Sequence, residues 1–228
     1  MTRTTNARIA GFTFLFYIAV GITQLVLEAP AKGSDTAAKL ALIAQHATRA
    51  RVNIMLGLII GVTAITLAVA LYGLTRDEDR DIAVLALCCR VGEGMLASIG
   101  TMASLGLLWL ATAGTGTSPP DAAAANALGA FLLKLGAWNT IIAATLFAVG
   151  SALFSWLLLR GRMIPAVLAW LGVMASVLLV VLLPLQLVGM LNSLVAQLMW
   201  LPMAAFEIPL ALWLLTKGVA APARRPSA

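Results

Sequence analysis

Long apolar runs separated by short polar segments dominate the pattern of the chain. A helix needs about 20 apolar residues to cross roughly 30 Å of hydrocarbon, and six runs are long enough. They cover about residues 9–28, 52–74, 82–112, 131–159, 163–187 and 190–216. The pattern therefore predicts an all-α fold, a polytopic membrane bundle of six transmembrane helices. We expect residues 1–228 to form a single integral membrane domain.

Two segments between these runs carry helix-start signals of their own. Residues 34–50 begin with Ser-Asp, a favourable cap, and predict a short amphipathic helix on the outer face after the first transmembrane helix. The sequence Ser-Pro-Pro-Asp at 118–121 marks another start. A helix from there to Arg160 would measure roughly 60 Å, twice the membrane thickness. Residues 121–130 therefore either project outward as part of the fourth transmembrane helix or form a separate surface helix.

Composition and charge support a membrane protein. Hydrophobic residues make up 61% of the chain and charged residues 11%, and the mean hydropathy is +0.99. Soluble proteins have about a quarter of their residues charged. The net charge of +6 does not indicate nucleic-acid binding, because basic residues lie singly or in pairs at the ends of apolar runs. The expected partner is the lipid bilayer, and the sequence leaves the oligomeric state open.

The distribution of lysine and arginine predicts the orientation in the membrane, since short cytoplasmic loops carry the excess of these residues. With the N-terminus inside, the cytoplasmic segments contain Arg3, Arg8, Arg76, Arg80, Arg160, Arg162, Lys217, Arg224 and Arg225. The outer loops contain Lys32, Lys39, Arg49 and Arg51, all in the first of them. We therefore expect both termini to face the cytoplasm.

Cysteine and histidine usage argues against several kinds of site. Cys88 and Cys89 are adjacent and cannot easily pair within one helix, so they are interpreted as small packing residues. His46 is the single histidine, which excludes a multi-histidine metal site or a bis-histidine haem within the chain. We expect no metal and no cofactor.

Three ionisable side chains occur where hydrocarbon is expected. Arg90 and Glu93 lie in the third apolar run, and Glu207 lies in the sixth. An ionised group at the bilayer centre costs about 2.5–3.5 kcal/mol, so such residues usually face the protein interior and find partners. Counting helical rise places Arg90 about 12 Å and Glu207 about 15 Å from the cytoplasmic ends of their helices. We expect Arg90 to pair with Glu207 across helices and with Glu93 along its own helix.

Softer polar and aromatic side chains are candidates to line a cavity beside this cluster. They are Asn53, Asn139, Gln186, Gln197 and Trp200. Polar groups of this kind also join helices to one another, at about 0.6 kcal/mol each. The sequence leaves open whether the charged cluster is a structural ion-pair network or a ligand, proton or catalytic site.

An ordered set of polar landmarks runs along the chain. It comprises Arg8 and Gly11, Arg51, the pair Arg90 and Glu93, and the ending FEIPLALWLLTKGV that contains Glu207. In these landmarks the chain resembles the bacterial membrane-protein family catalogued as domain of unknown function 4386, over about residues 7–219. The resemblance implies a multi-pass protein of the bacterial cytoplasmic (inner) membrane and supplies no activity.

The sequence favours a non-enzymatic bundle whose buried charges bind a small lipophilic or anionic ligand, a lipid or a proton, as in a carrier, receptor or accessory subunit. One alternative is a membrane-embedded enzyme acting on a lipid, with Glu93 and Glu207 as acid and base and Arg90 holding an anionic headgroup. No nucleophile motif accompanies these residues. The other alternative is a structural or assembly role in which the charges fix helix register.

Overall fold

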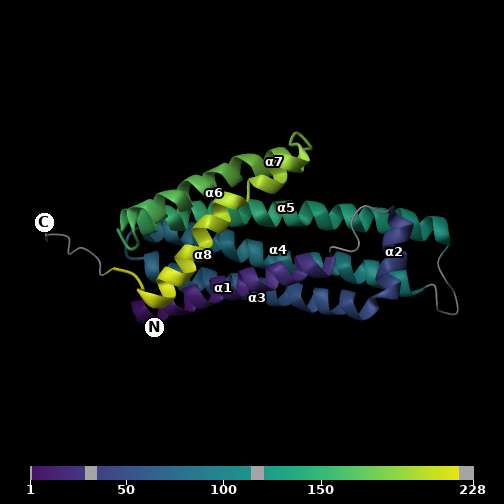
Figure 1. Ribbon diagram of the computed structural model, residues 1–228, viewed down its shortest axis with the longest axis horizontal. Coiled ribbons are helices and arrows are strands. Elements are labelled where there is room, and N and C mark those ends of the chain that lie inside the picture. Colours follow the sequence, from purple (N-terminus) through teal and green to yellow (C-terminus); the bar gives the residue numbers. More distant parts are fainter. Residues whose placement is uncertain (1, 29–34, 114–120, 221–228) are drawn as a thin grey trace, which may run out of the picture.

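The computed structural model describes residues 2–28, 35–113 and 121–220, and within these ranges the fold is all-helical. The helices are α1 (Arg3–Glu28), α2 (Thr36–Gln45), α3 (Ala47–Thr75), α4 (Arg80–Ala113), α5 (Ala122–Arg160), α6 (Ala166–Leu187), α7 (Ser193–Leu198) and α8 (Leu201–Thr216). Six segments of the described chain are long and apolar enough to cross a membrane, namely α1, α3, α4, α5, α6 and α7 with α8. The predicted all-α bundle with six membrane helices is confirmed (Figure 1).

The longest helix, α5, decides between the two alternatives for residues 121–130. Asp121 caps it by accepting a hydrogen bond of 3.3 Å from the backbone N–H of Ala124. From there the helix continues without a break for 39 residues to Arg160, or about 58 Å at 1.5 Å per residue. Because α5 is nearly twice as long as the hydrocarbon is thick, its first turns project beyond the bundle as part of the same helix.

The short helix predicted after the first apolar run is present as α2. The Asp35 side chain caps it by accepting a 2.8 Å hydrogen bond from the N–H of Ala38. The helix lies across one end of the bundle, against α3, α4 and α5 (Figure 1). Gly129 of α5 allows α2 to approach closely, since a Cβ at this position would lie 3.2 Å from a methyl carbon of Leu40 on α2. The end that α2 covers is called the α2 end below.

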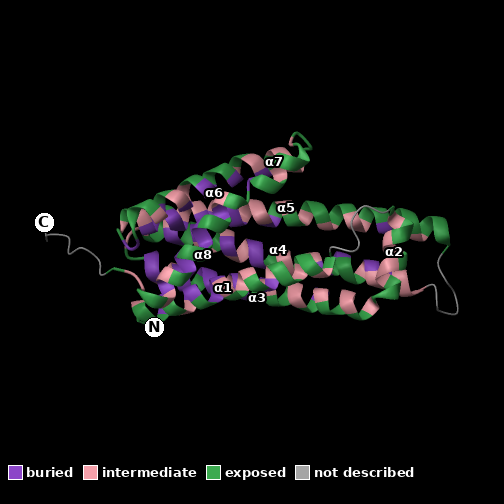
Figure 2. Ribbon diagram, in the orientation of Figure 1, coloured by how far each residue is buried: buried purple, intermediate pink, exposed green. Residues whose placement is uncertain are grey.

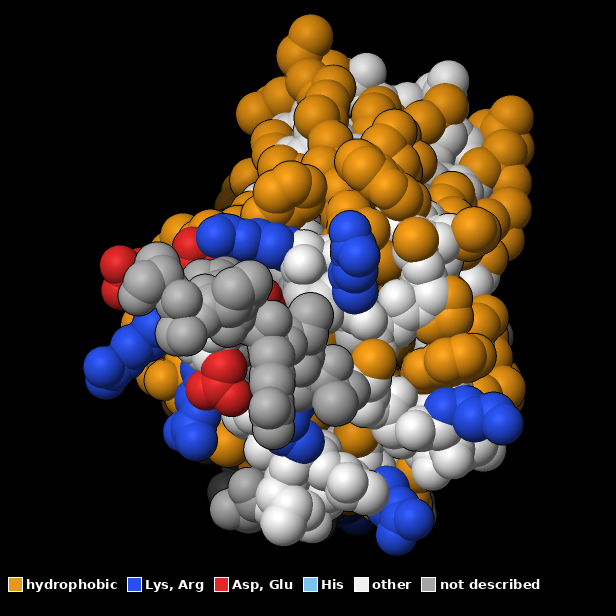
Figure 3. All heavy atoms as spheres, turned by 90° about the vertical axis from the view of Figure 1, so that its left-hand side faces the viewer, with side chains coloured by type: hydrophobic (Ala, Val, Ile, Leu, Met, Phe, Trp, Pro, Cys, Tyr) orange, Lys and Arg blue, Asp and Glu red, His pale blue; other side chains and the backbone are white. Residues whose placement is uncertain are grey.

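The opposite end gathers most of the basic residues that flank the membrane helices. The start of α1, the α3–α4 and α5–α6 connections and the end of α8 lie there together (Figure 1). Lys and Arg side chains spread around this end, with a few acidic side chains among them (Figure 3). We call it the basic end, defined by Arg76, Arg80, Arg160, Arg162 and Lys217. That it faces the cytoplasm remains a prediction.

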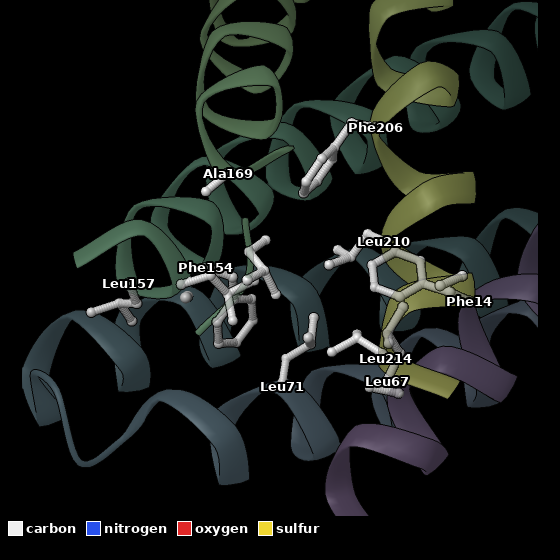
Figure 4. Close-up of a cluster of buried hydrophobic side chains, with 14 of the residues drawn as sticks. Phe14, Leu67, Leu71, Phe154, Leu157, Ala169, Phe206, Leu210 and Leu214 are labelled. Carbon is white, nitrogen blue, oxygen red and sulfur yellow. The ribbon is translucent and has the colours of Figure 1, made fainter. Parts of the chain in front are cut away.

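The hydrophobic core fills the half of the bundle nearer the basic end (Figure 2). Phe14 of α1, Leu71 of α3, Phe154 of α5 and Leu210 of α8 are among the buried side chains that converge there (Figure 4). Side chains from α1, α5 and α8 can meet in this core because α8 crosses the bundle diagonally (Figure 1). It packs on α6 along one part of its length and on α1 along another. Fewer residues are buried in the half toward the α2 end (Figure 2).

Glycines permit two of the closest helix crossings. A Cβ on Gly61 of α3 would lie 2.7 Å from the carbonyl oxygen of Gly94 on α4. A Cβ on Gly11 of α1 would lie 2.7 Å from the carbonyl oxygen of Ala211 on α8. Neither crossing has room for a side chain, so the backbones meet directly, as small residues allow in membrane bundles. The crossings hold α4 and α8 where their charged residues reach the interior.

The sixth apolar run, expected as one helix over 190–216, is divided into α7 and α8. Met199 and Trp200 separate the two helices. The cause is Pro202, which has no N–H to donate to the carbonyl of Leu198 and whose ring would clash with that carbonyl in a continuous helix. Pro202 instead occupies the first turn of α8, where proline is tolerated.

Candidate functional site

Arg90 and Glu93 form a buried ion pair on α4. The Arg90 Nη1 and Glu93 Oε2 atoms are 2.8 Å apart, and the residues are 1% and 3% exposed. A spacing of three positions places both side chains on neighbouring parts of one helix face. The pair therefore neutralises its own charges within α4, without help from a second helix.

The α5 helix shapes the space around the Arg90 side chain. A Cβ on Gly150 would lie 2.7 Å from Arg90 Cγ, so only glycine leaves room for the arginine stem. One turn earlier, the Phe147 ring centroid lies 4.6 Å from Arg90 Cζ, a cation–π contact. Arg90 Nε and Nη2 are buried without a hydrogen-bond partner in the part of the chain that the structure describes. The guanidinium is thus held between Glu93 and an aromatic ring.

Tyr17 of α1 completes the surroundings of Glu93. Its hydroxyl donates a hydrogen bond of 2.8 Å to Glu93 Oε1, so both carboxylate oxygens of Glu93 face a partner. Sequence reasoning did not single out Tyr17. The available signal was a tyrosine in the middle of an apolar run, because a buried phenol normally finds a hydrogen-bond partner.

Glu207 of α8 is buried and makes no direct polar contact with the part of the chain that the structure describes. The residue is 8% exposed, and its Oε1 atom has no hydrogen-bond partner among the described residues. Of the two ion pairs expected for Arg90, the pair with Glu93 is present and the pair with Glu207 is not found among the described residues. Depth counting placed the two residues at one level but could not give the directions of their side chains. Glu207 nevertheless lies within electrostatic range of both Arg90 and Glu93.

A cavity of about 850 Å³ connects these groups to the α2 end. Tyr17, Glu93, Phe147, Trp200 and Glu207 line it at one end, which we call the inner end. At the other end it is lined by residues of α2 and by the neighbouring ends of α1 and α3. Along α4 the lining extends from Glu93 to Leu107, about 21 Å of helix.

Three of the five candidate lining residues line this cavity, namely Asn53, Asn139 and Trp200. The Asn139 Nδ2 atom donates to the Leu96 carbonyl at 2.9 Å, so the asparagine also joins α5 to α4. Trp200 stands in the break between α7 and α8, with its ring centroid 6.2 Å from that of Phe147.

Gln186 and Gln197, the other two candidates, are not among the residues that line this cavity. Gln186 lies near the end of α6, a helix that packs on α5 and α8 and contributes no residue to the lining. Gln197 belongs to α7 and is exposed. The break at Pro202 explains its position, because α7 does not continue the face on which α8 carries Glu207.

The α2 end of the cavity is polar. Lys39 and His46 line it from α2 and the turn that follows, together with Arg49 and Glu28. The Arg49 Nη2 atom donates to the Val26 carbonyl at 2.9 Å. Asn53 Nδ2 donates to Glu28 Oε1 at 2.9 Å. Lys39, His46 and Arg49 were not predicted as lining, because α2 folds over the bundle only in the tertiary structure.

Exposed residues line the cavity along the bundle as well as at its α2 end, where Glu28 and His46 are exposed. Ser104 of α4 and Ala137 and Thr140 of α5 line it and are exposed. Helices α1 and α5 both contribute lining residues, but α1 packs on α3 and α8 whereas α5 packs mainly on α4 and α6. The opening along the bundle therefore lies between α1 and α5, with α4 as the floor.

A known protein family matches most of the chain. The sequence model of a family described as Domain of unknown function (DUF4386) matches residues 9–218. No curated protein and no solved structure matches the chain. The matched range contains all the residues that line the cavity.

Proposed function

Since the chain belongs to the family of Domain of unknown function (DUF4386), whose description assigns no activity, we propose from its own residues that it binds a small lipophilic molecule inside the membrane. The observation that carries this proposal is the cavity of about 850 Å³ with the unpartnered carboxylate oxygen of Glu207 at its inner end. The ligand would occupy the space between α1, α4 and α5.

The size and lining of the cavity suit a small molecule. Ligand pockets in proteins usually measure about 300–1,000 Å³ and combine apolar walls with a few polar groups. Here the walls include Ala97, Gly136 and Leu132, and the polar groups include Asn139. A carboxylate in such a place marks a functional site in membrane proteins, because burying it is costly.

The position of the opening favours entry from lipid. The gap between α1 and α5 lies along membrane-crossing helices, and α2 covers the end of the bundle. With the basic end toward the cytoplasm, as the positive-inside rule predicts, the opening lies in the outer half of the bacterial cytoplasmic membrane. A carrier, receptor or accessory subunit for a membrane-dissolved molecule would have this arrangement.

The contacts of Arg90 and Glu93 support a structural role for that pair and a binding role for Glu207. Glu93 faces Arg90 with one oxygen and Tyr17 with the other, which ties α1 to α4. A carboxylate engaged on both oxygens is poorly placed to exchange a proton with a substrate. This favours a binding protein over the alternative of an enzyme that uses Glu93 and Glu207 as acid and base.

Filling the cavity tests the proposal. Gly136 lines the cavity, and a Cβ there would meet only the Cβ of Ala103 at 3.9 Å, so Gly136→Phe should fold and occupy the space. Gly21 on α1 is a matched control, since it lies outside the lining and a Cβ there would meet nothing within 4 Å. Lipophilic molecules that co-purify with the wild type are measured by mass spectrometry.

A molecule retained by the wild type and by Gly21→Phe, and absent from Gly136→Phe, supports the proposed function. An identical set of co-purifying molecules in all three proteins, at bulk membrane proportions, contradicts it.

A further inference from the structure

We propose that the inner end of the cavity takes the protonated amine of an amphipathic ligand, with Glu207 as its counter-ion and Trp200 and Tyr17 beside it. The inference rests on the proposed function and names the chemical class of the ligand. It changes the expectation from the sequence, which allowed an anionic ligand held by Arg90.

The charges at the inner end leave one carboxylate unbalanced. Arg90 and Glu93 neutralise each other across 2.8 Å. Glu207 has no ion pair in the described chain, and its Oε1 atom is buried without a hydrogen-bond partner while the residue lines the cavity. The ionised form of a carboxyl group buried without a partner is strongly unfavourable, and a cation supplied by the ligand would remove that cost.

Arg90 is not available to an anion from the cavity. It is not a lining residue, whereas Glu93 and Glu207 are. One face of the Phe147 ring covers its guanidinium at 4.6 Å. An anionic group that entered the inner end would therefore meet two carboxylates before it met the arginine.

Aromatic rings at the inner end add to the preference for a cation. Tyr17, Phe147 and Trp200 line the cavity together with Glu207. The Phe147 and Trp200 ring centroids lie 6.2 Å apart with an angle of 37° between the ring planes. Ring faces attract ammonium groups, and several rings around a carboxylate are a recurring way to bind an amine.

The opposite end of the cavity carries charges of the other sign. Lys39 and Arg49 line it, and the acid there, Glu28, already accepts a hydrogen bond from Asn53. An amine is repelled from these cations and attracted to Glu207. The cavity would therefore orient a ligand with its amine inward and its apolar chain along the walls between α4 and α5.

A ligand series with one chain and three head groups tests this inference. Decylamine, decanol and decanoic acid are dialysed against the protein in phosphatidylcholine nanodiscs, and binding to empty nanodiscs is subtracted. In the wild type, decylamine should bind roughly tenfold or more tightly than decanol, the usual effect of a hydrogen bond to a charged group. Glu207→Gln should abolish the difference. Asp77→Asn, which removes the same charge from the exposed α3–α4 connection outside the cavity, should keep it.

Other binding results would overturn either the amine inference or the proposed function. The inference is overturned if the wild type binds decylamine and decanol with equal affinity, or if the preference for decylamine survives in Glu207→Gln. In either case the proposed function still holds if Gly136→Phe abolishes the binding of both compounds. No binding above empty nanodiscs by any of the three compounds contradicts the proposed function itself.

A second variant, Trp200→Leu, tests the inference if Glu207→Gln does not fold. Trp200→Leu should weaken the binding of decylamine severalfold more than that of decanol, because only the amine loses a ring contact. An equal loss for both ligands overturns the inference.

Discussion

The hydroxyl of Tyr17 on α1 donates a 2.8 Å hydrogen bond to the buried carboxylate of Glu93 on α4. This bond joins two helices that are far apart in the sequence, and it satisfies the Glu93 oxygen that does not face Arg90. It marks the inner end of the cavity as a place where polar partners are fixed before any ligand enters.

Replacing Tyr17 by phenylalanine should destabilise the protein. The variant leaves a buried carboxylate oxygen without its donor, which costs about 1–3 kcal/mol. Thermal unfolding in detergent measures the loss. Tyr72→Phe is the control, because the Tyr72 hydroxyl has no hydrogen bond within the described chain. Equal melting temperatures for the two variants would show that the bond to Glu93 contributes nothing.

The Arg90–Glu93 pair should behave as one unit. Arg90→Met leaves Glu93 buried without its cation and should lower the free energy of unfolding by about 3–5 kcal/mol. The double variant Arg90→Met with Glu93→Gln removes both charges and should recover a large part of this lost stability. Unfolding in a double-mutant cycle measures the coupling. The ion pair of Arg160 with Asp79, which is partly exposed, is the control; its coupling should stay near 0–1 kcal/mol. Coupling near zero at Arg90 and Glu93 would contradict the structural role.

Gly150 should tolerate no side chain. A Cβ there would lie 2.7 Å from Arg90 Cγ and 3.2 Å from the Ala86 carbonyl oxygen, so Gly150→Ala should cost about 1–3 kcal/mol through overpacking. Gly136→Ala on the same helix has its nearest contact at 3.9 Å and should be neutral or stabilising by up to about 1 kcal/mol, because alanine favours helix. Both are measured by thermal unfolding. A reversed order would mean that Arg90 does not occupy the space beside Gly150.

The orientation of the bundle can be tested by cysteine labelling in intact cells. With Cys88 and Cys89 replaced by alanine, a cysteine is introduced either by Ala41→Cys on the exposed side of α2 or by Asp77→Cys in the α3–α4 connection. A membrane-impermeant maleimide should label the first variant and not the second, since the basic end is predicted to face the cytoplasm. Labelling of Asp77→Cys alone would reverse the predicted topology.

Local sequence patterns were sufficient for the membrane helices and for α2. Hydropathy reports where a segment of chain prefers hydrocarbon, and the cap at Asp35 acts within one turn, so neither requires knowledge of the rest of the fold. The same kind of signal at Pro202 would have predicted the division between α7 and α8, had the proline been read as a helix start. The positions of Arg90, Glu93 and Glu207 within apolar runs likewise identified the charged residues that are buried in the described chain.

The spacing of three positions predicted the contact of Arg90 with Glu93, but only the tertiary structure decided what else these residues contact. Helical rise gives the depth of a side chain but not its direction, so Arg90 could be placed level with Glu207 although the two form no ion pair. The room that Gly150 leaves for Arg90 and the position of Trp200 in the α7–α8 break depend on how distant helices pack. The cavity depends on the same packing, because it lies between α1, α4 and α5 and is covered by α2. The sequence by itself determined which residues are costly to bury, and the packing of distant helices decided which of them were left without a partner.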